Sequence, residues 1–172
     1  VSYIHLKSES DRIASGQYPF AVYAWNYVGI NPYFKLVTIC KNDIISKEFV
    51  ELLQTSSTET EVEKISPDSW EGLEEIQLEK WQREVQEYKI AAGQSANYKL
   101  ESIRNNFINR KRILETKIAD IEDSSIKKMY RKELENAVAQ YECKVEEIAK
   151  KKSQADIHVT LIARGILHIQ NI

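Results

Sequence analysis

The chain has 172 residues, and its 42% hydrophobic and 29% charged side chains are typical of a soluble, folded protein. A formal net charge of −2 excludes binding to nucleic acid through the charge of the chain as a whole. No apolar run approaches the ~18 residues that a membrane-spanning helix needs, and no signal peptide opens the sequence. The length suits one compact domain with an extension.

The chain begins with Val1, so we interpret it as a piece of a longer protein. Its two cysteines, Cys40 and Cys143, lie far apart on different predicted elements. We expect them to be free thiols, which is the usual state in a reducing compartment. The expected localisation is therefore cytoplasmic.

Three strands are predicted near the N-terminus. Residues 18–28 carry apolar or aromatic side chains on both faces, which is typical of a strand that is covered on both sides. A turn at residues 29–32 leads into the β-branched residues 34–40, so these two segments are expected to form an antiparallel hairpin. A further short strand is predicted at residues 1–7.

Three aromatic residues, Tyr23, Trp25 and Tyr27, point to one face of the strand at residues 18–28. We interpret them as part of the sheet core. The alternative is a ligand-stacking platform in the pocket of an enzyme.

A short helix is expected after the second strand of this hairpin. Ser46 would be its N-cap, and Phe49, Leu52 and Leu53 would lie on one face. Residues 55–65 are polar and acidic and are interpreted as a linker.

The middle half of the chain, residues 66–155, is predicted to be a helical arm. Residues 66–68 supply a cap, a first-turn proline and an acid, which together favour a helix start. Trp70 and Trp81 would pack the beginning of the arm on the sheet. Gly93 would mark a kink, a break or a tolerated glycine.

Between about residues 94 and 153, apolar side chains recur at spacings of three and four in two runs that are separated by polar residues 122–125. This pattern predicts an antiparallel coiled-coil hairpin whose helices are each roughly 30 residues, or about 45 Å, long. Arg110 occupies one seam position. The apolar seam positions are Leu100, Ile103, Phe107, Leu114, Ile118 and Ile121, then Ile126, Tyr130, Leu134, Ala137, Tyr141, Val145 and Ile148.

The C-terminal residues 156–172 alternate apolar and polar side chains, which predicts one bent strand, or two short ones, around Gly165. The predicted fold is therefore α+β. Both chain ends, residues 1–65 and 156–172, form a small antiparallel β-sheet, and a long antiparallel coiled-coil helical hairpin is inserted between them.

Residues with catalytic or ligand-binding potential are scattered. The five glycines do not form a phosphate-binding loop. His5, His158 and His168 are not spaced with cysteines or acids as metal ligands would be. The sequence therefore predicts no catalytic, cofactor-binding or metal-binding residues, and a chain that is not itself an enzyme.

The outer part of the arm is mildly basic: residues 93–155 hold 14 bases and 10 acids, whereas residues 43–92 hold 5 bases and 13 acids. Several of these bases lie near the predicted tip of the hairpin. The candidate contacts for nucleic acid or a partner are Arg110, Lys111, Arg112, Lys127, Lys128, Arg131 and Lys132. In a hairpin that turns at residues 123–124, acids would face them in the pairs Lys132–Glu115, Lys127–Asp120 and Arg112–Glu135. Such exposed pairs, worth ~0–1 kcal/mol each, would fix the register. A phosphate-binding tip is the alternative.

Several short motifs are similar to those of a known family. They are the aromatic run at residues 18–25, Lys-Leu-Val at 35–37, Leu-Leu at 52–53, Lys-Lys-Met at 127–129, Ala-Asp-Ile at 155–157 and Gly-Ile-Leu at 165–167. Together they resemble the region that follows the motor in bacterial Swi/Snf-type helicases related to RapA. The resemblance covers most of the chain. The helicase motifs of that family belong to two RecA-like lobes, and none of these motifs occurs in this sequence.

The resemblance implies a non-catalytic accessory domain from the C-terminal part of an ATP-dependent helicase or translocase. It implies as partners the helicase motor domains of the parent chain, RNA polymerase and nucleic acid. Two alternatives do not need the motor: a freestanding coiled-coil adaptor that binds another protein, and a nucleic-acid-binding module that uses the basic tip. Self-association through the coiled coil is also compatible with the seam.

Overall fold

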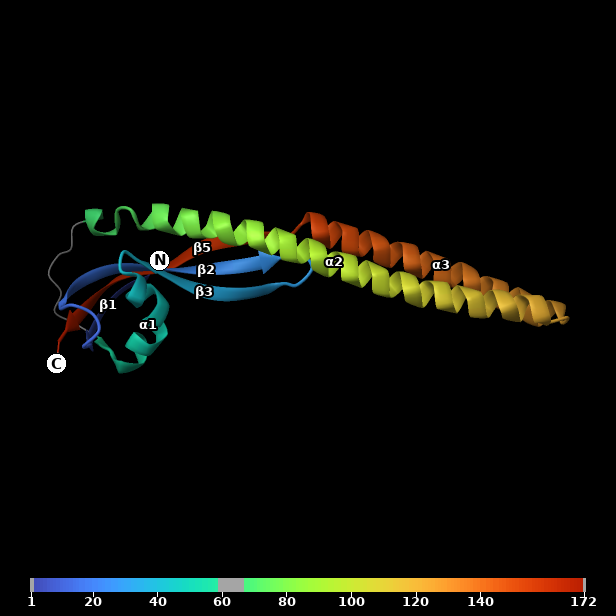
Figure 1. Ribbon diagram of the computed structural model, residues 1–172, viewed down its shortest axis with the longest axis horizontal. Helices are drawn as coiled ribbons and strands as arrows, with labels where there is room; N and C mark the ends of the chain where they lie inside the picture. The colour runs from blue at the N-terminus through green and yellow to red at the C-terminus, as the bar shows by residue number, and fades with distance from the viewer. Residues whose placement is uncertain (1, 59–66, 172) are drawn as a thin grey trace. The chain divides into compact units, whose positions relative to one another are not determined.

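The structure, a computed structural model, describes residues 2–58 and 67–171 (Figure 1). Its elements are β1 (Ser2–Glu9), β2 (Gly16–Val28), β3 (Tyr33–Cys40), α1 (Asp43–Thr55), β4 (Ser57–Thr58), a 3-10 turn (Pro67–Trp70), α2 (Leu73–Asp120), α3 (Ser124–Ser153) and β5 (Asp156–Gln170). The α+β prediction is confirmed, because both chain ends supply strands to one sheet and two long helices lie between them in sequence.

Two compact units divide the chain. The sheet unit comprises Val1–Tyr27, Tyr33–Gln86 and Ile157–Ile172, and the hairpin unit comprises Val28–Pro32 and Glu87–Asp156. The first turns of α2 therefore belong with the sheet, whereas the sequence pattern assigned the whole segment from residue 66 to the arm. In this part of α2 the large side chains contact strands rather than another helix.

The sheet has the strand order β3-β2-β5-β1-β4. β2 and β3 form the expected antiparallel hairpin, from Phe20 opposite Cys40 to Tyr27 opposite Tyr33. β1 and β5, however, pair in parallel along their whole shared length, so the sheet is mixed and the prediction of a purely antiparallel sheet is wrong in this respect. The apolar alternation of a strand specifies which side chains face the core, and it carries no information on the direction of the neighbouring strand.

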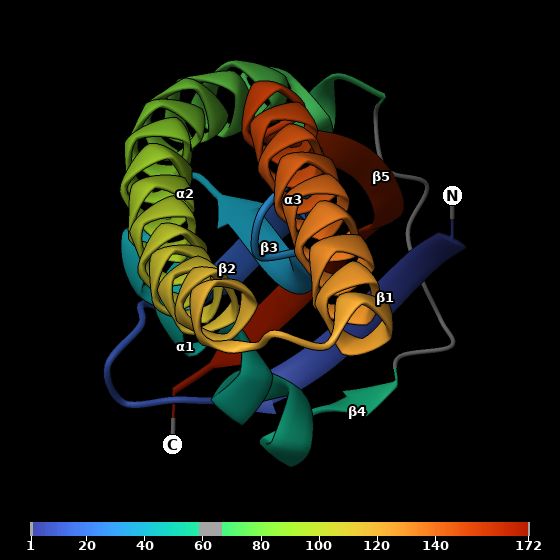
Figure 2. The same cartoon turned by 90° about the vertical axis from the view of Figure 1, so that its right-hand side faces the viewer.

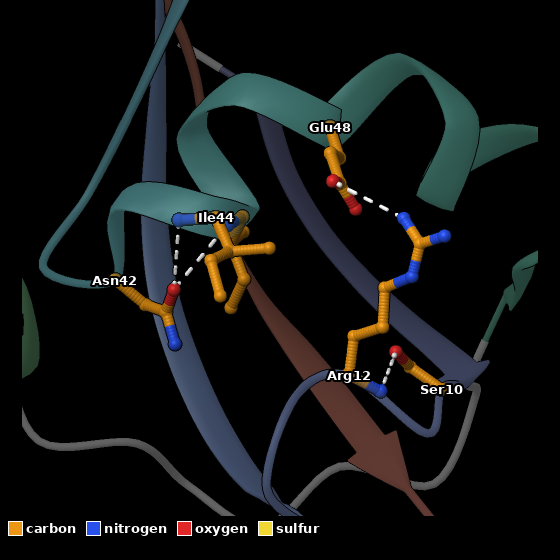
Figure 3. Close-up of polar contacts among 6 residues, drawn as sticks. Ser10, Arg12, Asn42, Ile44 and Glu48 are labelled. Atoms are coloured by element: carbon orange, nitrogen blue, oxygen red, sulfur yellow. Dashed lines mark hydrogen bonds and ion pairs between the residues drawn. The ribbon is translucent and has the colours of Figure 1, made fainter.

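Helix α1 covers one end of one sheet face. Its buried side chains Ile45, Phe49 and Leu52 join a core cluster with residues from β1, β2, β3 and β5. The expected N-cap, Ser46, is wrong: the side chain of Asn42 accepts hydrogen bonds from the backbone N–H groups of Ile44 and Ile45 (Figure 3). Asn is as good a cap as Ser, and it lies at the position where the chain leaves β3.

Ser46 instead connects α1 with the end of β3. Its hydroxyl oxygen accepts a 2.9 Å hydrogen bond from the backbone N–H of Cys40, and its hydroxyl group lies 3.2 Å from the carbonyl oxygen of Cys40. An exposed ion pair of 3.5 Å between Arg12 and Glu48 also joins the β1–β2 loop to α1 (Figure 3). The segment that was predicted to be a linker contains the short strand β4, which pairs with β1. Residues 59–66, which include the expected helix start at Ser66, lie outside the described residues.

Both tryptophans of the predicted arm base contact the sheet, as expected. The indole N–H of Trp70 lies within hydrogen-bond distance of the carbonyl oxygens of Phe20, at 3.1 Å, and Gly165, at 3.2 Å. The indole N–H of Trp81 donates to the carbonyl oxygen of Ile157 at 2.8 Å. Indole has one donor and a large apolar surface, so each tryptophan combines packing with a directional contact to the sheet backbone.

Gly165 lies within a single strand, β5, rather than between two strands. A Cβ atom at this position would meet the carbonyl oxygen of Ile4 on β1 and the ring of Phe20 on β2. The glycine is therefore needed for close approach of the three strands.

The two helices of the hairpin unit lie side by side in both views and are joined by a short loop (Figures 1 and 2). The loop, residues 121–123, overlaps the predicted polar stretch at residues 122–125 but begins at Ile121, which was expected to be a helical seam residue. Asp123 caps α3 by accepting hydrogen bonds from the backbone N–H groups of Ser125 and Ile126. Gly93 lies inside the continuous helix α2, so it is a tolerated glycine and not a break. Of the helices in the described ranges, none has the length and apolarity to cross a bilayer.

Candidate interaction surface of the helical hairpin

The aromatic residues of β2 belong to the sheet core. Tyr23, Trp25 and Tyr27 are 6%, 2% and 0% exposed, respectively, so the ring faces that a ligand would need for stacking are already covered. This burial favours the interpretation as core over the interpretation as a ligand platform.

A small polar network lies beside these rings. The Tyr27 hydroxyl donates to Oε1 of Glu84 at 2.6 Å, and the ammonium group of Lys35 contacts the same oxygen at 2.8 Å. Burial, together with the hydrogen bond to Glu84, raises the pKa of Tyr27 far above its ordinary value. Burial acts to raise the pKa of Glu84, but the hydrogen bonds from Lys35 and Tyr27 outweigh it and the pKa is lowered. Both shifts favour the charge states that these groups already have at neutral pH.

The remaining candidates for chemistry are dispersed. In residues 2–58 and 67–171, no three side chains of His, Cys, Asp or Glu form a group that could hold a metal ion. Cys40 is buried, Cys143 is exposed, and both are free thiols. The surface of the hairpin unit therefore offers the more informative features.

Rings stack across the seam of the hairpin, which confirms its register. The centroids of Phe107 and Tyr141 are 4.4 Å apart and their planes differ by 11°. Nearer the loop, the ammonium group of Lys117 lies 5.1 Å from the ring centroid of Tyr130. Both contacts join residues that the antiparallel pairing places at the same height.

The seven basic candidates lie in two groups along the sequence, residues 110–112 on α2 and residues 127–132 on α3. Arg110 contacts Glu133 at 3.3 Å across the seam, and Lys111 contacts Glu115 at 3.7 Å on its own helix. The other five are spread over both helices, and Arg112, Lys128, Arg131 and Lys132 are exposed.

None of the three expected pairs, Lys132–Glu115, Lys127–Asp120 and Arg112–Glu135, is an ion pair in the described part of the chain. The register was correct, but five of these six side chains are exposed and only Lys127 is half-buried. The charges therefore do less to fix register than the pattern suggested.

A cavity of about 130 Å³ opens on the hairpin where Arg110 lies opposite Ala137. Hydrogen-bonding groups from both helices line it, namely Asn106, Arg110, Gln140 and Lys144, beside the rings of Phe107 and Tyr141. Ala137 is 4% exposed and too small to fill the space across from an arginine that turns outward. The sequence marked Arg110 as an irregular seam residue, but Asn106, Gln140 and Lys144 were missed. The sequence feature that could have indicated this cavity is the position of Arg110 opposite the small residue Ala137 in the seam.

Comparison of the sequence with protein-family models and with curated proteins finds no match.

Proposed function

We propose that the chain is a non-catalytic accessory domain of an ATP-dependent Swi/Snf-type DNA helicase or translocase. The sheet unit would be the anchor on the motor domains of the parent chain, and the hairpin unit would be the docking surface for a partner. RNA polymerase and nucleic acid are the partners that the family resemblance suggests.

The observation that supports an interaction role is the surface of the hairpin. Its two helices stabilise each other through the Phe107–Tyr141 stack, and most of their polar side chains are exposed. Paired helices of this kind are rigid, and they present large surfaces without needing a catalytic pocket.

Two contacts at the base of the hairpin unit support its use as a rigid element. The Tyr88 hydroxyl lies 3.1 Å from the carbonyl oxygen of Val28 and 3.2 Å from that of Asn31. The ammonium group of Lys99 donates to the carbonyl oxygen of Ile30 at 3.3 Å. The loop at residues 28–32 is thus held against α2 by side chains that the seam does not use.

The proposal is tested by measuring ATP hydrolysis with the purified chain and with the full parent protein. The parent should hydrolyse ATP in a reaction that nucleic acid stimulates, whereas the chain alone should show no turnover above a no-protein control. Nucleic-acid-stimulated hydrolysis by the chain alone would contradict the proposal.

A second candidate function, nucleic-acid binding through the tip, draws on the exposed cations that lack ion pairs in the described residues. Replacing Arg112, Lys128 and Arg131 by Ala should then weaken binding to a DNA or RNA oligonucleotide and reduce its dependence on salt. Absence of binding at low salt would exclude this function. A freestanding coiled-coil adaptor is the third candidate, and it differs from the first in having no motor.

A further inference from the structure

One side of the hairpin collects residues from both helices, and we name it the Arg110 face. Arg110 contacts Glu133 at 3.3 Å and Gln140 at 3.5 Å, which places these three residues on the same side. The shared cavity adds Asn106 and Lys144. Helical spacings of three and four then extend the face toward the loop, through Ile113 and Lys117 on α2 and through Ile126 and Met129 on α3.

In the part of this face near the loop, three apolar side chains are open to solvent beside the charged residue Lys117. Ile113, Ile126 and Met129 are 52%, 43% and 56% exposed, respectively. Single exposed apolar residues are ordinary, but three on one side of a hairpin, within about two turns of its loop, offer apolar surface for packing. Methionine adapts its shape to different partners, which suits a docking surface.

The part of the face farther from the loop is rich in hydrogen-bond donors. Arg110 and Lys144 both line the cavity of about 130 Å³, together with the amide groups of Asn106 and Gln140. The acid closest to Arg110 is Glu133, at a long 3.3 Å, and among the described residues Lys144 forms no ion pair within 4 Å. A carboxylate from outside could accept hydrogen bonds from both cations in this cavity.

We infer that the Arg110 face binds an acidic, amphipathic helix of a protein partner. Apolar side chains of that helix would cover Ile113 and Met129, and a Glu or Asp side chain would enter the cavity between Arg110 and Lys144. The exposed apolar surface favours a protein over nucleic acid, because contacts to a phosphate backbone do not use apolar side chains. This inference rests on the proposed function and specifies the partner class of the same hairpin.

The test measures fluorescence anisotropy of a labelled synthetic helical peptide, with leucines along one face and glutamates beside them, as the full chain is added. One control peptide has glutamine in place of glutamate, a second has serine in place of leucine, and a labelled DNA duplex is the third probe. Lys144→Glu and Met129→Ser are the test variants. Their matched controls are Lys150→Glu, at an exposed lysine of the same helix α3, and Ile108→Ser, whose side chain is 48% exposed on another side of α2.

We expect the leucine–glutamate peptide to bind more tightly than both control peptides and than DNA. Lys144→Glu and Met129→Ser should each raise its Kd about tenfold, which corresponds to ~1.4 kcal/mol. The matched variants should leave the Kd within about twofold, the range typical of uninvolved surface positions. Circular dichroism of each variant is the control that checks whether the variant remains helical.

Three outcomes would overturn the inference: tighter binding of DNA than of the peptide, equal losses in test and matched variants, or no peptide binding at roughly millimolar protein. Each would leave the accessory-domain proposal standing, because that proposal is contradicted by ATP turnover of the isolated chain and not by the binding of this peptide.

Discussion

Phe107 and Tyr141 stack face to face across the hairpin, with ring centroids 4.4 Å apart and planes 11° from parallel. Each ring comes from a different helix, and the two positions are 34 residues apart in the sequence (141 minus 107). The stack therefore reports directly on the register of the antiparallel pair. It also forms one wall of the cavity beside Arg110.

Removing one ring should loosen the hairpin. Phe107→Ala should lower the free energy of unfolding by about 2 kcal/mol, less than for a fully buried Phe because this ring is only half-buried. Chemical denaturation followed by circular dichroism measures the change. Tyr98→Ala is the matched control, because Tyr98 lies on the same helix and is 73% exposed. An equal effect of both substitutions would contradict the role of the stack.

Two glycines should respond in opposite directions to the same substitution. Gly165→Ala should destabilise by about 1–3 kcal/mol, because its Cβ would meet the Ile4 carbonyl oxygen and the Phe20 ring. Gly93→Ala should stabilise by about 0.5–1 kcal/mol, because Gly93 is inside α2 and its Cβ would meet only the Lys152 side chain, at 3.9 Å. Thermal unfolding of the two variants and of the unsubstituted chain shows whether each substitution raises or lowers the stability. A loss of stability in Gly93→Ala would show that the glycine is required there.

Glu84 should make the stability of the chain sensitive to acid. The pKa of Glu84 is lowered in the folded chain, so its ionised form stabilises the fold at pH values above the ordinary pKa of a glutamate, near 4.5. This contribution is lost as the pH falls through the pKa of the folded state. Replacing Glu84 by Gln should therefore reduce stability at pH 7 and flatten its dependence on pH below about 4.5. Denaturation at a series of pH values measures this. Glu79 is an exposed acid on the same helix, so Glu79→Gln should leave the dependence of stability on pH as it is in the unsubstituted chain.

The capping of α3 offers a local test of the loop. The Asp123 side chain accepts hydrogen bonds of 2.8 and 3.1 Å from the N–H groups of Ser125 and Ile126. Asp123→Ala should cost about 1 kcal/mol, and Asp123→Asn should restore most of this, since Asn is an equally good cap. Thermal melts of the three proteins distinguish capping from a loss of charge. A defect of equal size in Asp123→Asn would mean that the negative charge, rather than the hydrogen bonds, is what stabilises the helix start.

Much of the fold followed from periodicity. The apolar runs around Phe107 and Tyr141 and the polar residues between them were enough to predict the hairpin and its register. The parallel pairing of β1 with β5 was not predictable, because β5 reaches its place only after the chain has passed through both long helices. Asn42 and Ser46 are both good caps, and only the end of β3 determines which of them lies at the helix start.

The candidate surface was only partly visible in the sequence. Arg110 stood out as a charged residue in an apolar seam, but Gln140 and Lys144, which line the same cavity, come from α3 and are distant in sequence. The expected ion pairs failed for a related reason. The antiparallel pairing predicts only which residues lie at the same height along the hairpin, whereas the direction of each long side chain depends on its angle around the helix. Lys132 and Glu115 match in height, yet Glu115 pairs with Lys111 on its own helix instead.

The measurement that tests the proposed accessory role most directly is the sequence of the reading frame upstream of Val1. An accessory domain of a Swi/Snf-type motor predicts an open frame that encodes the helicase motifs of two RecA-like lobes before this chain. A start codon immediately beside Val1, with no such motifs in frame, would contradict the proposal and favour the freestanding adaptor.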